Sequence, residues 1–148
     1  MSYAIWPDSH DIIADWVCRA LGLINVWKGQ NVTYGFSFGT KMIGGLIFHD
    51  LQPHREVWWT VWSCDKHWCN RTMLHKMFHK AFIEMDCKRI NILVNINNQR
   101  SLDFVERLGF VREGRLRQYD DNGEDCYFLG MLRQECKWLT NRKEKTNE

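Results

Sequence analysis

Residues 98–117 read NQRSLDFVERLGFVREGRLR, and this stretch decides the expected fold. Asn98 and Ser101 belong to the residue types that favour the start of a helix, and Gly109 is the type that ends one. A short helix is therefore predicted between Ser101 and Leu108. After this helix the chain is expected to return to the core at Phe110 and to continue into a β-hairpin. The sequence Asp-Asp-Asn-Gly at 120–123 strongly predicts the turn of that hairpin.

Outward from this stretch, the spacing of apolar residues predicts the remaining elements. Helices are expected over 9–21 and 70–85, and strands over 32–38, 42–49, 55–63, 90–95, 110–119 and 125–132. The strand at 55–63 carries apolar residues on both faces, as is typical of a central strand covered on two sides. The order helix, three strands, helix, strand, helix and hairpin indicates an α/β (α+β) domain with a mixed sheet. Its strand, loop and helix from 55 to 85 place backbone donors where an anionic ligand is favoured.

The composition narrows the class of protein. Of 148 residues, 45% are hydrophobic and 26% charged, which is typical of a globular chain. One domain over 1–140 is expected, with a disordered polar tail over 141–148. The apolar runs are shorter than the ~20 residues that span a bilayer, and 1–10 lack a secretion signal, so we expect a cytoplasmic protein with no membrane partner. The net charge of +2 does not favour a nucleic acid partner, and the six cysteines are interpreted as reduced thiols.

The segment from 98 to 114 resembles the GNAT superfamily of acyl-CoA-dependent N-acyltransferases. The matching pattern is Asn98-x-x-Ser101, six intervening residues, Leu108-Gly109-Phe110 and then Glu113-Gly114. Within the superfamily it is most similar to ribosomal-protein-type acetyltransferases and small GNAT proteins carried by phages. The resemblance implies a mixed, mostly antiparallel central sheet flanked by helices on both faces. It also implies acetyl-CoA as co-substrate and an amine as acceptor, with no metal.

The resemblance assigns a loop to the diphosphate of CoA. In the family this loop has the pattern Gln/Arg-x-x-Gly-x-Gly/Ala and lies at the N-terminus of the long helix. The corresponding residues here are Lys66-His67-Trp68-Cys69-Asn70-Arg71, and Thr72 follows them. Cys69 and Arg71 replace the two glycines, so the backbone cannot take positive φ at little cost. Lys66 and Arg71 would supply positive charge to phosphate oxygens.

The family also has a splayed central strand that pairs with the pantetheine arm. Thr60, Val61 and Trp62 occupy that place in this sequence. Asn98, at the start of the helix before Leu-Gly-Phe, is a further candidate for cofactor binding.

Catalysis requires a neutral amine and benefits from an acid at the leaving thiolate. Glu56 is the candidate base, because it begins the central strand near the place where lysine-acetylating GNAT enzymes carry a Glu. Many members use a Tyr in the helix before Leu-Gly-Phe as the general acid, but the matching position here is Val105. Ser101 is the candidate acid, with Tyr119 and Tyr127 as alternatives.

Structural roles are open for the same residues. Glu56 can be a solvated residue at a strand edge, and Asn98 and Ser101 can serve purely as helix caps. A zinc site is another alternative, because several metal-ligating residue types gather in one region: Cys64, His67, Cys69, His75, His79 and Cys87. The sequence contains no Cys-x-x-Cys, and the spacing from Cys69 to His75 does not match a zinc finger, so no metal is predicted.

The predicted function is the transfer of an acetyl group from acetyl-CoA to a primary amine by direct attack in a ternary complex. One alternative is a catalytically weak or inactive binding or regulatory protein on the same fold, which lost efficient CoA use along with its glycines. Another is a small interaction module whose aromatic groove binds a peptide. The sequence leaves a homodimer and the identity of the amine open, because acceptor pockets come from variable loops, here 24–30 and 120–125.

Overall fold

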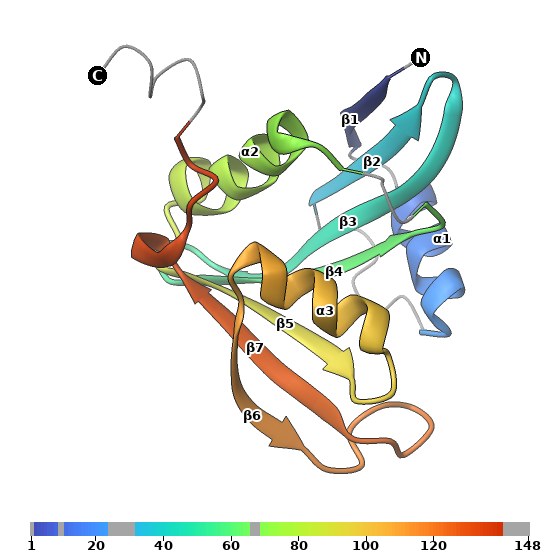
Figure 1. The fold of residues 1–148 in the computed structure, drawn as a ribbon, viewed down its shortest axis with the longest axis vertical. Coiled ribbons are helices and arrows are strands. Elements are labelled where there is room, and N and C mark those ends of the chain that lie inside the picture. Colours follow the sequence, from blue (N-terminus) through green and yellow to red (C-terminus); the bar gives the residue numbers. More distant parts are fainter. Residues whose placement is uncertain (1, 9–10, 24–31, 66–68, 141–148) are drawn as a thin grey trace.

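The computed structural model describes residues 2–8, 11–23, 32–65 and 69–140, which form a seven-stranded sheet with helices on both faces (Figure 1). The strands are β1 (Tyr3–Asp8), β2 (Val32–Phe38), β3 (Lys41–Gln52), β4 (Glu56–Ser63), β5 (Arg89–Asn95), β6 (Val111–Leu116) and β7 (Cys126–Leu132). Their order in the sheet is β1-β2-β3-β4-β5-β7-β6. β4 and β5 run parallel, and the other neighbouring pairs are antiparallel. This mixed, mostly antiparallel sheet confirms the predicted fold class.

The helices are divided between the two faces of the sheet (Figure 1). They are α1 (Asp11–Leu21), α2 (Arg71–His79), which continues into a π-helical turn (Lys80–Glu84), and α3 (Gln99–Leu108). α1 packs its buried Ala14 and Val17 against Ile47 of β3. α2 and α3 cover the opposite face and share the main core with Trp59 of β4. Successive side chains of a strand point to opposite faces, so Thr60 and Trp62 lie on the α1 face.

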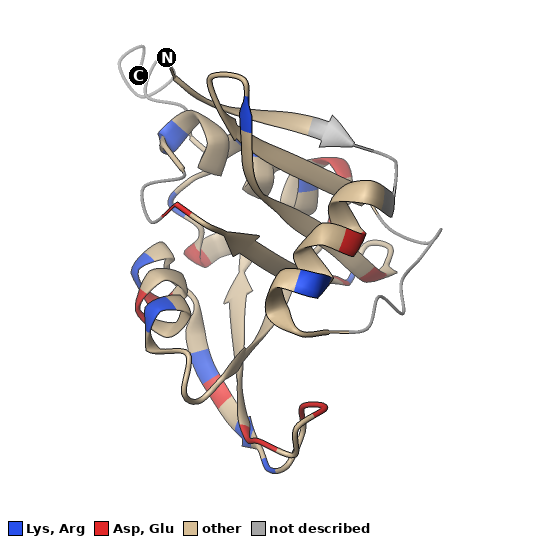
Figure 2. Cartoon of the chain, turned by 90° about the vertical axis from the view of Figure 1, so that its right-hand side faces the viewer, with Lys and Arg blue, Asp and Glu red and all other residues tan. Residues whose placement is uncertain are grey.

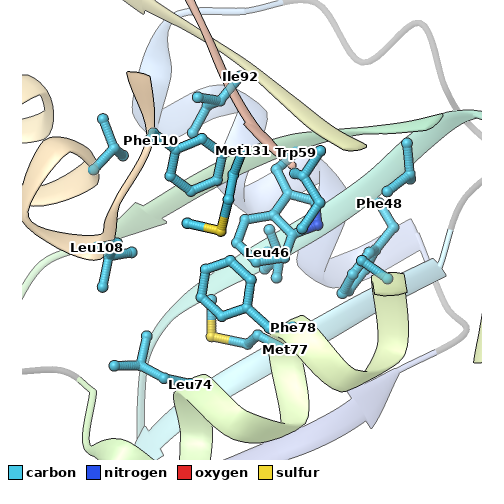
Figure 3. Packing of buried hydrophobic residues seen from close by; sticks show 14 of the residues in the cluster. Leu46, Phe48, Trp59, Leu74, Met77, Phe78, Ile92, Leu108, Phe110 and Met131 are labelled. Carbon is cyan, nitrogen blue, oxygen red and sulfur yellow. The ribbon is translucent and has the colours of Figure 1, made fainter. Parts of the chain in front are cut away.

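Trp59 occupies the centre of the main core (Figure 3). Its ring centroid lies 4.8 Å from that of Phe78 in α2, 5.7 Å from that of Phe48 in β3 and 5.9 Å from that of Phe110. Such aromatic pairs contribute ~0.5–1.5 kcal/mol each beyond the area they bury. Phe110 directly follows Gly109, which ends α3 with a φ of 117°. The predicted return of the chain to the core after this glycine is confirmed.

The hairpin of β2 and β3 carries a bulge and lies directly against α1. The register shifts between Phe36 and Ser37, and Phe36 is paired with Gly44. A Cβ on Gly45 would lie 2.5 Å from the Cγ2 atom of Ile13 in α1. Glycine therefore allows α1 to approach the strand backbone closely.

The hairpin of β6 and β7 extends beyond the helices, and every residue of β6 is exposed. Both basic and acidic residues occur along it (Figure 2). Arg115 pairs with Asp125 at 2.7 Å, and Arg112 pairs with Glu106 of α3 at 2.7 Å. Exposed pairs of this kind contribute at most ~1 kcal/mol each. They balance charge on this surface rather than create a strongly basic patch.

The structure corrects the sequence-based prediction in two elements. β1 was not predicted, because it is short, contains Pro7 and pairs with β2 alone, and its Trp6 is 56% exposed. The helix predicted over 70–85 ends as α-helix at His79 and continues as the π-helical turn. An apolar stripe has nearly the same spacing in both helix types, so periodicity does not separate them. The predicted tail over 141–148 lies outside the described residues.

None of the helices in the described segments is long and apolar enough to cross a membrane.

Candidate active site in the fork between β4 and β5

β4 and β5 separate partway along their length (Figure 1). They pair from Glu56 and Arg89 as far as Trp59 and Ile92, and within the described residues their pairing goes no further. β4 continues to Ser63 with β3 as its neighbour on the other side. The backbone groups of β4 that face β5 beyond Trp59 therefore lack a partner in the sheet. The splay predicted at Thr60, Val61 and Trp62 is present.

A pocket of about 130 Å³ lies at this fork. It is lined by Leu21, Val61, Trp62, Ser63, Asn98, Arg100, Ser101 and Phe104. Leu21 ends α1 on one face of the sheet, whereas Ser101 and Phe104 belong to α3 on the other face. The pocket is therefore lined by elements from both faces of the sheet, beside the end of β4. The structure brings two of the predicted residues of β4, Val61 and Trp62, together with Asn98 and Ser101, whereas Thr60 is not part of this lining.

Asn98 and Ser101 do different things at the start of α3. The Asn98 side-chain oxygen accepts a hydrogen bond from the Ser101 backbone N–H at 3.2 Å, so Asn98 is the N-cap. The structural role considered for Asn98 is confirmed. For Ser101 that role is wrong, because its backbone is the capped group and α3 already begins at Gln99. The Ser101 side chain lines the pocket.

The N-terminus of α2 carries the second part of the candidate site. Lys66 and the neighbouring His67 and Trp68 lie outside the described residues. Asn70 is the N-cap of α2, and its side-chain oxygen accepts a hydrogen bond from the Met73 N–H at 3.0 Å. The first N–H groups of a helix have no partner inside it, which here applies to Arg71 and Thr72. Together with the helix dipole, these donors favour an anion.

Cys69 and Arg71 stand where the family pattern has glycine. Burial raises the pKa of the Cys69 thiol to about 11, so this side chain is an uncharged filler. The Arg71 guanidinium lies over the Trp138 ring at 5.3 Å and donates a hydrogen bond to the Lys137 carbonyl at 3.4 Å. The C-terminal segment thus orients Arg71, whose buried Nε has no partner in the described part of the chain.

Glu56 lies at the end of β4 away from the pocket. Val61 is five positions further along the strand, which is about 17 Å at the usual rise. The structure therefore does not bring the candidate base and the pocket together. Asn91, 1% exposed, donates to the Glu56 carboxylate at 2.9 Å and accepts from the Arg89 Nε at 2.6 Å. The alternative of a solvated strand-edge residue is wrong, because Glu56 belongs to a half-buried polar network on a central strand.

His49 of β3, which is not among the predicted site residues, lies beside the fork. His49 is 6% exposed, and its Nε2 is 2.8 Å from the Thr60 hydroxyl oxygen. Its Nδ1 is 2.7 Å from a carboxylate oxygen of Asp50. Burial lowers the pKa of His49, although the Asp50 carboxylate acts in the opposite direction. A His-Asp dipeptide at a strand end was the available signal, but no local pattern indicates the contact across to Thr60.

A second hollow, of about 280 Å³, lies at β1, β2 and α2. It is lined by Ile5, Tyr34, His75, Lys76, His79 and Glu84. The rings of His75 and His79 lie 5.5 Å apart, centroid to centroid. Among the described residues, no group of three or more His, Cys, Asp or Glu is placed to hold a metal ion.

The two tyrosines considered as general acids lie outside the pocket lining. Tyr119 is 55% exposed, and the Arg112 guanidinium lies over the Tyr127 ring at 4.3 Å. Of the acid candidates, Ser101 is the one that reaches the fork.

Comparison with known proteins agrees with this geometry. A family model described as an acetyltransferase (GNAT) domain matches residues 1–111 of the 148. The chain belongs to the GNAT acetyltransferase family. The GNAT match extends from β1 through α3 and so includes the fork, the N-terminus of α2 and the Leu-Gly-Phe junction. The resemblance drawn from residues 98–114 is confirmed.

Individual GNAT relatives overlap only part of their own length with this chain. The N-alpha-acetyltransferase MAK3 of Arabidopsis thaliana is 36% identical over 53 residues, which are 36% of this chain and 28% of that protein. RimJ of Mycobacterium smegmatis, solved in complex with CoA-disulfide, has a TM-score of 0.62 at 18% identity. The match covers 72% of this chain and 55% of the RimJ chain. A mutant of the spermidine N-acetyltransferase SpeG of Vibrio cholerae has a TM-score of 0.62 at 20% identity. The match covers 77% of this chain and 69% of the SpeG chain. At these identities the structural likeness shows the fold.

Proposed function

We propose that this chain transfers an acetyl group from acetyl-CoA to a primary amine by direct attack in a ternary complex. The observation that carries the proposal is the fork between β4 and β5 in a GNAT domain, with a pocket at the point where the strands part. An unpaired strand edge offers backbone donors and acceptors to an extended amide-containing ligand. A pocket lined by α1 on one face of the sheet and by α3 on the other would let the acyl donor and the amine approach it from opposite faces.

Specific residues are proposed to hold acetyl-CoA. The backbone of Thr60, Val61 and Trp62 would pair with the pantetheine amides, and Asn98 lines the same pocket. The N–H groups of Arg71 and Thr72 would receive the diphosphate, with the backbone of Cys69 and Asn70 beside them. Lys66 and Arg71 would add positive charge. When bound, acetyl-CoA supplies the thioester carbonyl that the amine attacks.

Proposed roles in proton transfer follow from position. Glu56 is the proposed base, because its carboxylate is held by Asn91 on the α1 face of β4, on the side from which an amine would approach. At the strand distance given above, Glu56 would act on an amine before it reaches the fork, or through water. Ser101 is the proposed hydroxyl donor at the leaving sulfur, because its side chain lines the pocket.

A catalytically weak or inactive binding protein on the same fold is the second candidate, and one observation favours it. Arg71 is held against Trp138 and Lys137. A diphosphate site that lacks its glycines and whose arginine is already engaged would bind CoA less tightly. This alternative allows acetyl-CoA to bind without turnover.

The test begins with calorimetric titration of the purified full chain with acetyl-CoA. Micromolar binding by the wild type, lost in the Lys66→Glu, Arg71→Glu double variant, would support the substituted loop as a phosphate site. A Lys41→Glu, Arg117→Glu double variant makes the same change in net charge at two exposed positions outside the pocket lining and should bind normally. Absence of binding up to millimolar acetyl-CoA would contradict the proposal.

Turnover separates the enzyme from the binding protein. Release of the CoA thiol would be followed with a lysine-free peptide that has a free α-amino group, and with spermidine. These two amines correspond to the activities named for MAK3 and SpeG. Glu56→Gln should reduce turnover while acetyl-CoA binding stays unchanged. Tight acetyl-CoA binding with no acetylation of either amine would favour the binding protein.

A further inference from the structure

We propose that His49, acting through the hydroxyl of Thr60, carries a proton from the attacking amine to the leaving sulfur during acetyl transfer. The inference rests on the proposed acetyltransferase function and adds two roles to it. The Thr60 hydroxyl contacts the reacting atoms. His49 accepts the proton of that hydroxyl and later returns it. Asp50 positions the imidazole.

The position of Thr60 carries the first part of the argument. Thr60 is the first residue of β4 after the last pair with β5, so it stands at the point where the strands part. Val61, the next residue, already lines the pocket. The Thr60 side chain points to the α1 face, on the side from which the amine would enter. Its hydroxyl is therefore four residues nearer to the fork than Glu56 on the same face of β4.

The geometry of His49 carries the second part. His49 and Thr60 lie on the neighbouring strands β3 and β4, with 2.8 Å between imidazole Nε2 and hydroxyl oxygen. The Asp50 carboxylate is 2.7 Å from Nδ1. A carboxylate only accepts hydrogen bonds, so Nδ1 carries the proton. In the neutral imidazole, Nε2 then accepts the hydrogen bond of the Thr60 hydroxyl.

The backbone conformation of Asp50 brings its carboxylate to the His49 imidazole. Neighbouring residues of a regular strand point to opposite faces, so Asp50 would ordinarily turn away from His49. Asp50 instead has a φ of 50°, in the left-handed region, and the register of β3 against β4 shifts between His49 and Gln52. This conformation is unfavourable for a non-glycine residue and persists only where the surrounding structure holds it. It brings the carboxylate to the imidazole, and strained residues at strand bulges are frequent beside active sites.

The electrostatics suit a proton carrier. Burial lowers the pKa of His49, so its imidazole is neutral near pH 7 and ready to accept. When it accepts, the Asp50 carboxylate stabilises the imidazolium. Glu56 is the other titratable group on this face of β4. The arrangement is that of an acid, an imidazole and a hydroxyl in a row, which is a general device for moving a proton to and from a hydroxyl-bearing group.

The proton balance of the reaction leaves a role for such a carrier. An arriving ammonium nitrogen loses two protons before it becomes an amide N–H. The first goes to Glu56 and then to solvent. As the C–N bond forms, the second passes to the Thr60 oxygen while the Thr60 proton moves to His49 Nε2. As the C–S bond breaks, the same proton returns through Thr60 to the sulfur, so the products are amide, CoA thiol and one proton in solvent.

The test compares variants of the full chain in the acetylation assay with the α-amino peptide and spermidine. Thr60→Val removes the hydroxyl with little change of shape in a strand, and Thr60→Ser keeps it. Thr60→Val and His49→Gln should each lower kcat by about 100-fold or more, the usual range for a lost proton-transfer group. Thr60→Ser should stay within about tenfold of the wild type, and the dissociation constant of acetyl-CoA should be unchanged in all three.

A pH profile distinguishes proton transfer from a structural role. Wild-type kcat should fall as the pH drops through the pKa of His49, and this limb should vanish in His49→Gln. Circular dichroism checks that each variant is folded. Equal losses in Thr60→Val and Thr60→Ser, or a limb that persists in His49→Gln, would overturn the inference while leaving the proposed function intact. A wild type that acetylates neither amine would overturn both.

Discussion

Gly44 of β3 and Ser63 of β4 are paired so closely that a Cβ on Gly44 would stand 2.7 Å from the Ser63 Cα. The same Cβ would overlap the carbonyl oxygen of Trp62. Since β5 has already diverged at this point, β3 is the neighbouring strand that supports the end of β4. Gly44 therefore keeps one wall of the fork in place.

Gly44→Ala should destabilise the protein by about 3 kcal/mol, because a methyl group cannot be accommodated without moving β4 away from β3. The measurement is the urea midpoint of unfolding. Gly114→Ala is the matched control, since nothing lies within 4 Å of its Cβ position and its φ is not positive. A Gly44→Ala midpoint equal to that of Gly114→Ala would show that the close pairing is not rigid.

Asn98 and Ser101 should separate stability from activity. Asn98→Ala removes the cap of α3 and should lower the free energy of unfolding by about 1 kcal/mol. Ser101→Ala leaves the cap in place and should change stability by less than about 0.5 kcal/mol while reducing kcat. Urea denaturation and the acetylation assay check the pair. If Ser101→Ala destabilises as much as Asn98→Ala and leaves kcat intact, Ser101 has a structural role alone.

Asn91 should be more sensitive to substitution than the carboxylate it contacts. Asn91→Leu leaves Glu56 and Arg89 without their buried partner, so we expect a loss of about 2 kcal/mol in the free energy of unfolding. Glu56→Gln keeps an acceptor for the Asn91 amide and should cost less than about 1 kcal/mol. Chemical denaturation of both variants checks the order. The reverse order would mean that charge on Glu56, rather than the amide of Asn91, holds the network.

His49 should make stability depend on pH. Its pKa is lower in the folded protein than the usual 6.5, so below that value the unfolded state binds more protons. The free energy of unfolding should therefore fall as the pH drops from about 7 toward the folded pKa of His49. The pKa values of Asp86, Asp120 and Asp125 are also lowered, from the usual 3.8 of an aspartate. These three carboxylates therefore change stability mainly at a more acidic pH than His49 does.

Urea denaturation between pH 7 and 5 measures this dependence. His49→Gln should reduce its slope. A slope that is the same in the wild type and His49→Gln would contradict the assignment.

The cysteines should react in an order set by burial. Cys64 is exposed, whereas burial raises the pKa of Cys69, Cys87 and Cys136 to about 11 each. The thiolate is the reactive form, so at pH 8 iodoacetamide should modify Cys64 first. Peptide mass spectrometry after timed quenching gives the order. Labelling of Cys69 as fast as Cys64 would mean that the start of α2 opens in solution.

Local chemistry explains why several features were predictable. Asn98, Gly109 and Phe110 have their roles because of residue type and spacing within one helix turn or junction. The N-cap at Asn70 and the hairpins follow from equally short stretches. β1 and the π-helical turn were not predicted, because the sequence pattern of β1 is weak and that of the π-helical turn is shared with an α-helix.

Residues close in the chain are enough to predict the turns, the end of α3 at Gly109 and the GNAT resemblance, because these depend on local residue types and their spacing. The tertiary structure alone decided that β4 and β5 part after Trp59, that Glu56 lies away from the pocket, and that His49 meets Thr60. Those relationships depend on which strands pair and in what register. A shift of one residue would turn every side chain to the other face of the sheet, and no local pattern specifies it.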